Sequence, residues 1–207
     1  MLRAALNAVL PMRCALCGAY LKTEVGICAS CDARISSDAL VDGNLLHLGN
    51  YHGRLERAAM ALKFAKNREV AVPLARKLAR GVQAAGWRAD ALVPLPIHAA
   101  RARTRTYNQA QVIADALGKM LEVPVLPALE RTRATYTQAR LSKREREDNV
   151  RGVFKLVRDV TGLEVLLVDD VYTSGATATE ASIALIAGGA KRVRVVTLAR
   201  ARTAFER

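Results

Sequence analysis

From residue 91 onward, short apolar runs alternate with segments that have the apolar spacing of helices. The runs begin at Ala91 ("ALVPLP"), Val123 ("VPVLP"), Gly152 ("GVFKL"), Glu164 ("EVLLVDD") and Arg192 ("RVRVVTLAR"). The helical segments are "NQAQVIADALGKML", expected to close near Gly118, and "ATATEASIALIAGGA", with a glycine stop. Strands joined by such helices form right-handed βαβ units, so we expect an α/β fold with a mostly parallel sheet flanked by helices.

Upstream of this alternation, the pattern is helical. Apolar residues recur at helical spacing from Leu55 to Phe64, and a second amphipathic helix follows in "EVAVPLARKLARGVQAAG", with Gly86 after its end. Its polar side is expected to carry Arg76, Lys77 and Arg80. The preceding stretch, residues 36–50, is rich in turn formers and is expected to be a linker with a short strand at "LLHLGNY".

All four cysteines lie near the amino terminus. They form two Cys-x-x-Cys pairs, Cys14 with Cys17 and Cys28 with Cys31. Two such turns supply the four sulfur ligands of a tetrahedral zinc site, and a site filled by four thiolates stabilises structure rather than catalysing a reaction. The alternatives are two redox-active dithiols or a site that has lost its metal. The three histidines match no ligand spacing.

This spacing predicts a zinc-binding ribbon module over residues 1–40 and an α/β domain over residues 41–207. The stretch "MLRAALNAVLPMRC" is expected to be a short amphipathic helix rather than a signal peptide, because Asn7 interrupts its apolar run. A cytoplasmic location follows, where thiols stay reduced and clustered cysteines bind metal.

The chain is strongly basic. Its 207 residues include 32 Lys and Arg against 19 Asp and Glu, a formal charge of +13. Such a surplus favours polyanionic partners such as nucleic acid or phosphorylated ligands, although a basic surface without a partner has the same composition. No apolar run is long enough to span a membrane.

The segment "LLVDDVYTSGAT" combines an apolar strand, two acids and a loop of hydroxyl residues. Ligands of a parallel sheet bind beyond the carboxyl ends of its strands, which is where Asp169 and Asp170 are expected. The loop offers the hydroxyls of Thr173, Ser174 and Thr177, the open backbone of Gly175, and a helix beginning near Ala176. Unpaired amides at that helix start favour phosphate. Neither a Walker A loop nor a dinucleotide fingerprint is present.

Two carboxylates beside a phosphate repel it unless they address another part of the ligand. The vicinal hydroxyls of a ribose are donors, and Asp169 and Asp170 can accept from both. A ribose carrying a 5-phosphate therefore satisfies the acids and the loop together. The alternative is that the two acids only cap the turn and the helix.

This segment resembles the phosphoribosyl pyrophosphate (PRPP) motif of type I phosphoribosyltransferases, and further motifs resemble the ComF family. They are the paired Cys-x-x-Cys, "YHGRLERA", "LKFAKNRE", "PLPIHAARARTRTYNQA" and "RTRATYTQARLSKREREDNVRGVF", which together extend over nearly the whole chain. Two departures are Thr106, where the family usually has glycine, and Ser174, where threonine is frequent. Neither removes a charged group.

The resemblance implies a role for each matching residue. Asp169 and Asp170 would hold the ribose hydroxyls and offset the positive charge that develops as pyrophosphate leaves, with Mg²⁺ bridging ribose and pyrophosphate. The loop would wrap the 5-phosphate with Thr173, Ser174, Gly175, Ala176 and Thr177. Arg101, Arg103 and Arg105 would clamp the diphosphate, helped by Asn108 and Gln109; the alternative is that they form only a solvated basic loop. A mobile lid would contain Arg131, Arg133, Arg140, Lys143, Arg144 and Arg146. Gln138 and Asn149 match family positions for which we derive no role.

The resemblance leaves two functions open. The first is a phosphoribosyltransferase acting on an unknown acceptor in natural competence, during the uptake and processing of single-stranded DNA. The second is a non-catalytic module that senses PRPP and binds single-stranded DNA, or serves as an adaptor, beside a helicase-like competence partner. In an adaptor, the zinc module would dock a partner protein. With aromatic residues at only 4%, DNA binding is expected to be mainly electrostatic and sensitive to salt.

Overall fold

A computed structural model describes residues 12–22, 24–64, 67–97, 107–133 and 152–201 of the chain. Among these residues, five strands form one sheet in the order β1-β2-β7-β6-β3. Their bounds are β1 Leu40–Asp42, β2 Leu45–His47, β3 Ala91–Pro94, β6 Glu164–Tyr172 and β7 Arg192–Arg200. β3, β6, β7 and β2 are mutually parallel, and only β1 pairs in the antiparallel sense. The predicted α/β fold with a mostly parallel sheet is confirmed.

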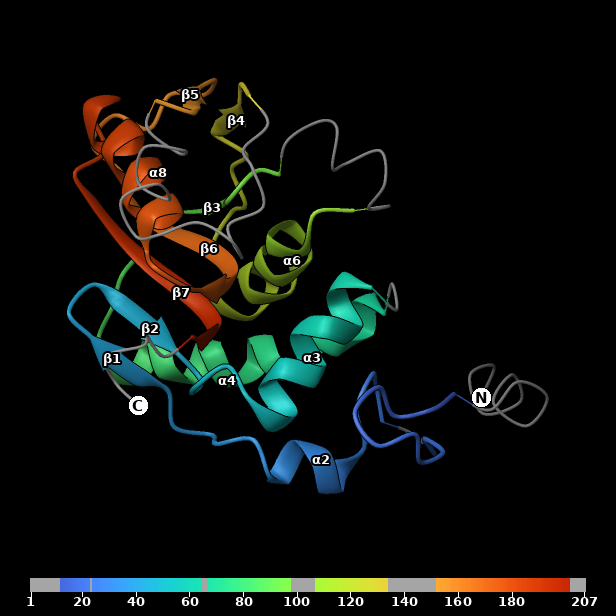
Figure 1. The fold of residues 1–207 in the computed structure, drawn as a ribbon. Helices are drawn as coiled ribbons and strands as arrows, with labels where there is room; N and C mark the ends of the chain where they lie inside the picture. Colours follow the sequence, from blue (N-terminus) through green and yellow to red (C-terminus); the bar gives the residue numbers. More distant parts are fainter. Residues whose placement is uncertain (1–11, 23, 65–66, 98–106, 134–151, 202–207) are drawn as a thin grey trace.

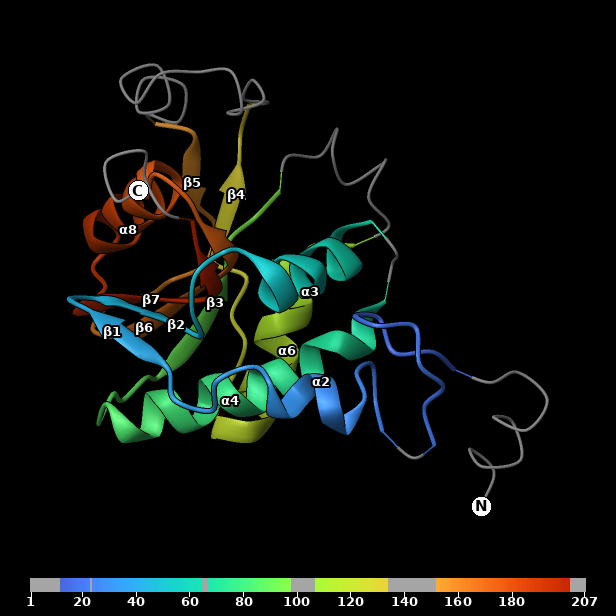
Figure 2. The ribbon, with the colours of Figure 1, turned by 60° about the horizontal axis from the view of Figure 1, so that its bottom comes forward.

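Helices cover both faces of this sheet (Figure 1). On one face lie α3 Gly53–Lys63, η1 Arg68–Val70, α4 Ala71–Ala84 and α6 Gln109–Leu121. On the other lie α8 Ala176–Ala187 and a hairpin of β4 Leu129–Arg131 and β5 Phe154–Leu156. Each face has its own buried hydrophobic cluster. Figure 2 shows the short helix α2 Ala29–Ala33 and the rest of the cysteine module beside α4, on the outside of the first layer.

Four sequence predictions differ from the structure in detail. Residues 36–50 are no linker, because β1 and β2 extend the main sheet from β7. The expected strand "VPVLP" makes only one isolated bridge, Val125 to Leu92. α6 runs past Gly118 and ends with Glu122 in the left-handed conformation. β6 continues beyond the acid pair to Tyr172, because β7 is equally long and pairs with it up to Arg200.

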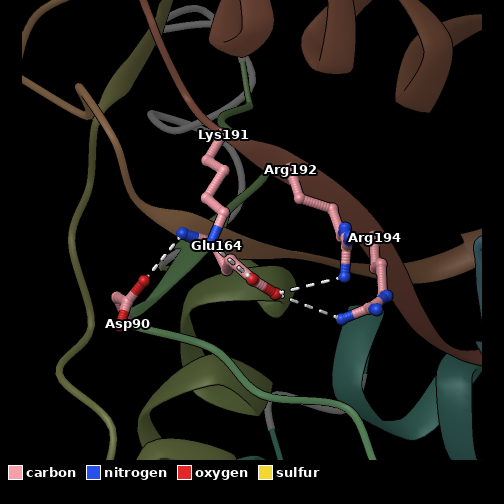
Figure 3. Close-up of polar contacts among 5 residues, drawn as sticks. All are labelled: Asp90, Glu164, Lys191, Arg192 and Arg194. Carbon is pink, nitrogen blue, oxygen red and sulfur yellow. Dashed lines mark hydrogen bonds and ion pairs between the residues drawn. The ribbon is translucent and has the colours of Figure 1, made fainter.

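At the amino ends of β6 and β7, the carboxylate of Glu164 forms ion pairs with three basic side chains (Figure 3). Glu164 lies within 3.6 Å of the guanidinium groups of Arg192 and Arg194 and 3.3 Å from the ammonium of Lys191. Its backbone N–H donates to Asp90, just before β3. Glu164 is paired with Arg192 in the ladder, so these contacts support the register of the sheet. They lie at the end of the strands opposite the acid pair.

The cysteine module packs directly on the helical layer, and the buried side chains of both form one hydrophobic cluster. Lys77 of α4 was expected on the polar side of its helix, and this prediction is wrong. Its side chain is buried, donates to the carbonyl of Ile35 (3.1 Å) and pairs with Asp32 at 3.3 Å. The reason is that this side of α4 faces the module rather than water. Arg57 of α3 makes a second link, to the carbonyl of Leu16.

Gly26 marks the closest approach between the module and this layer. It has a positive φ of 72°, and a Cβ at this position would lie 2.5 Å from the backbone of Glu69 and Val70. Only glycine fits such an approach. Across the described part of the chain, no helix is both long and apolar enough to cross a membrane.

Candidate functional site

A cavity of about 340 Å³ opens where β3 and β6 end. Its wall brings together the acid pair of β6, the loop that follows β6, the residues after β3 and the start of α6. Lining residues include Asp169, Asp170, Thr173, Thr177, Leu95, Pro96, Asn108 and Gln109. The structure therefore places residues from two separate predicted motifs, "LLVDDVYTSGAT" and "PLPIHAARARTRTYNQA", around a single space.

The two acids are held by local backbone hydrogen bonds. Asp169 accepts from the N–H of Asp170 at 2.8 Å, and Asp170 accepts from the N–H of Val171 at 2.9 Å. Burial, followed by the negative charge of Asp170, holds the pKa of Asp169 well above its ordinary value, while the guanidinium of Arg131 acts in the opposite direction. A carboxylate held beside a second carboxylate favours a nearby cation or donor hydroxyls.

The loop after β6 leads directly into the amino end of α8. Gly175 is the N-cap of α8 with a positive φ of 80°, so α8 begins at Ala176 as predicted. Within the described part of the chain, the backbone N–H groups of residues 173–175 have no hydrogen-bond partner. The Ser174 hydroxyl accepts only a long bond, 3.5 Å, from the N–H of Ala176. Free amides at the positive end of a helix are the groups that bind phosphate.

Gly175→Ala tests this loop. A Cβ there would lie 2.2 Å from the Tyr172 hydroxyl, and the left-handed backbone adds roughly 1–2 kcal/mol of strain. Either the Tyr172 ring or the loop must shift, so we expect about tenfold weaker binding of a phosphorylated ribose, measured by calorimetry. Gly162→Ala is the matched control, because its φ is 75° but nothing lies within 4 Å of the added Cβ. Equal binding by both variants would contradict a role of this loop in phosphate binding.

Asn108 and Gln109, predicted to contact a diphosphate, both line the cavity but are also tied to the fold. Asn108 caps α6 by accepting from the N–H of Ala110 (3.1 Å), and its amide donates to the carbonyl of Leu95 (2.9 Å). Gln109 is buried, with its amide 3.5 Å from the carbonyl of Tyr107. Asn108 thereby fixes both ends of the segment between β3 and α6.

Sequence reasoning did not place three other side chains at this cavity. Tyr51 follows β2, Lys63 ends α3, and Arg131 ends β4, yet all three line the same cavity as Asp169. Arg131 was expected only in a mobile lid, and Lys63 appeared only as a letter of "LKFAKNRE". Lys63 and Arg131 bring positive charge to a wall that also contains two acids.

Several predicted residues lie outside the described residues. They are Arg101, Arg103, Arg105, Gln138, Arg140, Lys143, Arg144, Arg146 and Asn149. Most of the helix predicted in "MLRAALNAVLPMRC" also lies there, so these assignments stay predictions. The last residues of that stretch are described and are not helical, because Arg13 makes an antiparallel bridge to Tyr20. The division of the chain at residue 40 likewise stays a prediction.

The four cysteines form a compact group that could hold a metal ion. Their sulfur atoms all lie within 4.8 Å of one another, and those of Cys17 and Cys28 are 3.7 Å apart. Four sulfurs around a tetrahedral ion at a bond length of about 2.3 Å are separated by about 3.8 Å. Cys14 Sγ accepts from the N–H groups of Leu16 and Cys28 at 3.4 and 3.3 Å. The donor set and its spacing fit a tetrahedral thiophilic metal.

The thiols of this group differ in proton affinity. Burial would raise the pKa of Cys14, but backbone N–H donors, that of Cys28 first, lower it to about 6. Burial, followed by the neighbouring sulfur of Cys17, raises the pKa of Cys31 to about 12. Four thiols packed this closely cannot all ionise without a cation among them.

A parallel sheet with an acid pair on β6, followed by a hydroxyl loop and the helix α8, is the arrangement of type I phosphoribosyltransferases. The match to the family described as phosphoribosyl transferase domain covers residues 69–206. The chain therefore belongs to this family, and its relatives place it among the ComF-like members.

Two relatives match along most of their length. The chain is 30% identical over 203 residues to the DNA utilization protein YhgH of Salmonella typhimurium, covering 90% of this chain and 89% of that protein. It is 30% identical over 197 residues to Competence protein F of Haemophilus influenzae, covering 91% and 84%. Among solved structures, the glutamine PRPP amidotransferase of B. subtilis is 21% identical, with a TM-score of 0.45, over 67% of this chain and 30% of that one.

Proposed function

We propose that the cavity binds PRPP together with Mg²⁺. The observation that supports this most directly is that Asp169, Asp170, Thr173 and Thr177 line one wall of a single space. The acids would accept from the two ribose hydroxyls, and the N–H groups of residues 173–175 would hold the 5-phosphate. A diphosphate would then lie toward Lys63 and Arg131 and the segment after β3, to which the predicted Arg101 and Arg105 belong.

Mg²⁺ would bind at this site as a counterion, coordinated mainly by the ligand and by water rather than by protein side chains. It prefers oxygen donors and keeps several waters, so it needs few direct protein ligands. Burial, followed by the charge of Asp170, raises the pKa of Asp169, so the ionised form of this carboxylate would be favoured by a nearby cation. Mg²⁺ bound together with the ligand would supply that positive charge.

If the chain transfers the phosphoribosyl group, the bond between the ribose C1 and the pyrophosphate breaks as a bond to the acceptor forms. Asp169 and Asp170 would offset positive charge on the ribose, and Lys63 and Arg131 would hold the departing pyrophosphate. The acceptor would have to approach from the opposite face of the ring. A non-catalytic site that senses the same ligand would use the same contacts without an acceptor.

We further propose that this site serves DNA handling. The relatives carry the names DNA utilization protein and Competence protein F, and the formal charge of +13 suits a partner rich in phosphate. A helicase-like partner and a cytoplasmic location belong to the same proposal. The proposed function is thus that of a ComF-type protein that couples the binding of PRPP to the binding of single-stranded DNA.

We also propose that the cysteine group holds structural zinc. Four sulfurs leave no open position for substrate, so the metal would stabilise the module rather than take part in the reaction. The module over residues 1–40 would then be a zinc ribbon attached to the α/β domain.

A pyrophosphate release assay separates the transferase from the sensor. With PRPP and Mg²⁺ present, we expect pyrophosphate to be released only when the panel of bases, amines and oligonucleotides contains the acceptor. The control is the same assay without candidate acceptors. Ligand binding without release across the panel would favour the sensor, and the absence of binding would contradict both readings.

A further inference from the structure

The carboxyl end of α3 carries an exposed aromatic ring. The side chain of Phe64, the residue that follows α3, is 61% exposed, and Met60 one turn earlier is 44% exposed. Phe64 does not belong to either buried hydrophobic cluster. Isolated exposed apolar residues are common on protein surfaces, so any role of this ring depends on the charged and aromatic side chains beside it.

One cation lies over the Phe64 ring, and another lies over the ring of Tyr107. The Lys63 ammonium lies 5.6 Å from the centre of the Phe64 ring, and the Arg68 guanidinium lies 4.5 Å from the centre of the Tyr107 ring. Tyr107 is held against the end of α3 because its hydroxyl donates to the carbonyl of Leu62. Residues 60–70 contain three cations and one acid. The surface is therefore aromatic and positively charged at once.

This surface adjoins the cavity. Lys63 contributes to both, because it lines the cavity with Asp169 and Asp170 while its ammonium faces Phe64. Tyr107 immediately precedes the cavity residue Asn108, which caps α6. A ligand that stacks on Phe64 would thus lie at the side of the cavity formed by the end of α3.

We propose that Phe64, with Lys63 and Arg68 beside it, is a stacking platform for single-stranded DNA at the mouth of the cavity. The inference rests on the proposed role in DNA handling and specifies the surface. Unpaired bases stack on exposed aromatic rings, whereas the bases of a duplex are already stacked on one another. Arg68, over the Tyr107 ring that is held at the same end of α3, would contact a phosphate next to the stacked base. Tyr20 is also highly exposed and has Arg13 over its ring, but it lies in the cysteine module and does not line the cavity, whereas Phe64 directly follows the cavity residue Lys63.

The test is the anisotropy of a labelled oligothymidylate of about 16 nucleotides, titrated with the full chain at low salt. Phe64→Ala should weaken binding by about tenfold, because one stacked base is lost. Phe64→Tyr should bind as wild type does, since the ring is kept. Ile183→Ala is the matched control, an equally exposed apolar residue (56%) on α8 at the other face of the sheet, and should have no effect.

The inference is overturned if Phe64→Ala binds the oligonucleotide as tightly as wild type, or if a duplex of the same length binds as tightly as the single strand. Failure of the wild type to bind single strands would also overturn it. A parallel titration with PRPP and Mg²⁺ measures binding at the cavity independently of Phe64, since Phe64 does not line the cavity. Retained PRPP binding without oligonucleotide binding would mean that the platform serves an apolar protein segment instead.

Discussion

Removing the proposed zinc should lower the midpoint of thermal unfolding of the whole chain by roughly 10 °C or more. The effect extends beyond the module because its buried side chains belong to the same hydrophobic cluster as α3 and α4. Lys77 and Arg57 also lose their partners if the module unfolds. The measurement is metal content together with circular dichroism melting, with and without chelator, under reducing conditions.

Two variants in the same Cys-x-x-Cys turn sharpen this test. Cys28→Ser removes a ligand and should reproduce the effect of the chelator. Ser30→Ala changes an exposed residue between two ligands and should keep both the metal and the melting temperature. A wild-type protein that is purified without stoichiometric metal and melts at the same temperature after chelation would contradict the zinc proposal.

Asp169→Asn combined with Asp170→Asn should weaken PRPP binding by roughly 100-fold or more. The reason is that each lost hydrogen bond to a charged acceptor is worth roughly 1.5–3 kcal/mol, and 1.4 kcal/mol corresponds to tenfold. Asn keeps the size of Asp and can still accept from the backbone N–H groups that hold this pair. The control Asp38→Asn with Asp115→Asn changes two exposed acids and the same net charge, and should bind normally.

The same pair of substitutions should not destabilise the fold. Because the pKa of Asp169 is raised, the folded state holds its proton to a higher pH than the unfolded chain does. The free energy of unfolding therefore falls as the pH rises from the ordinary pKa of an aspartate to the raised pKa of Asp169. The double variant has no buried carboxylate to ionise at these positions, so its melting temperature at neutral pH should equal or exceed that of wild type. A lower value would mean that lost binding reflects unfolding.

The central strands and the helices between them could be predicted because their patterns are long and regular. β7 extends from Arg192 to Arg200 as its sequence indicates, and α8 begins at the residue after Gly175. The short strand expected at "LLHLGNY" is present as β2, but β1 was not predicted. The place of both strands in the main sheet could not be predicted either, since it depends on pairing of β2 with β7 about 150 residues later.

At the candidate site, the residues of contiguous motifs were predictable, whereas those brought in from other elements were not. Asp169, Asp170 and the loop follow one another in the sequence. Lys63 and Arg131 reach the cavity from α3 and β4, and only the fold brings them together. Lys77 was misplaced for a similar reason, because nothing in α4 itself indicates that the cysteine module covers that side.

The account is tested most directly by calorimetric titration of PRPP into the wild-type chain, with and without Mg²⁺, and in competition with ribose 5-phosphate. We predict one site per chain, tighter binding with Mg²⁺, and competition by ribose 5-phosphate, which carries both the hydroxyls and the phosphate that the cavity is proposed to hold. Binding that is absent, or that persists unchanged in the Asp169→Asn, Asp170→Asn variant, would contradict the assignment of this cavity.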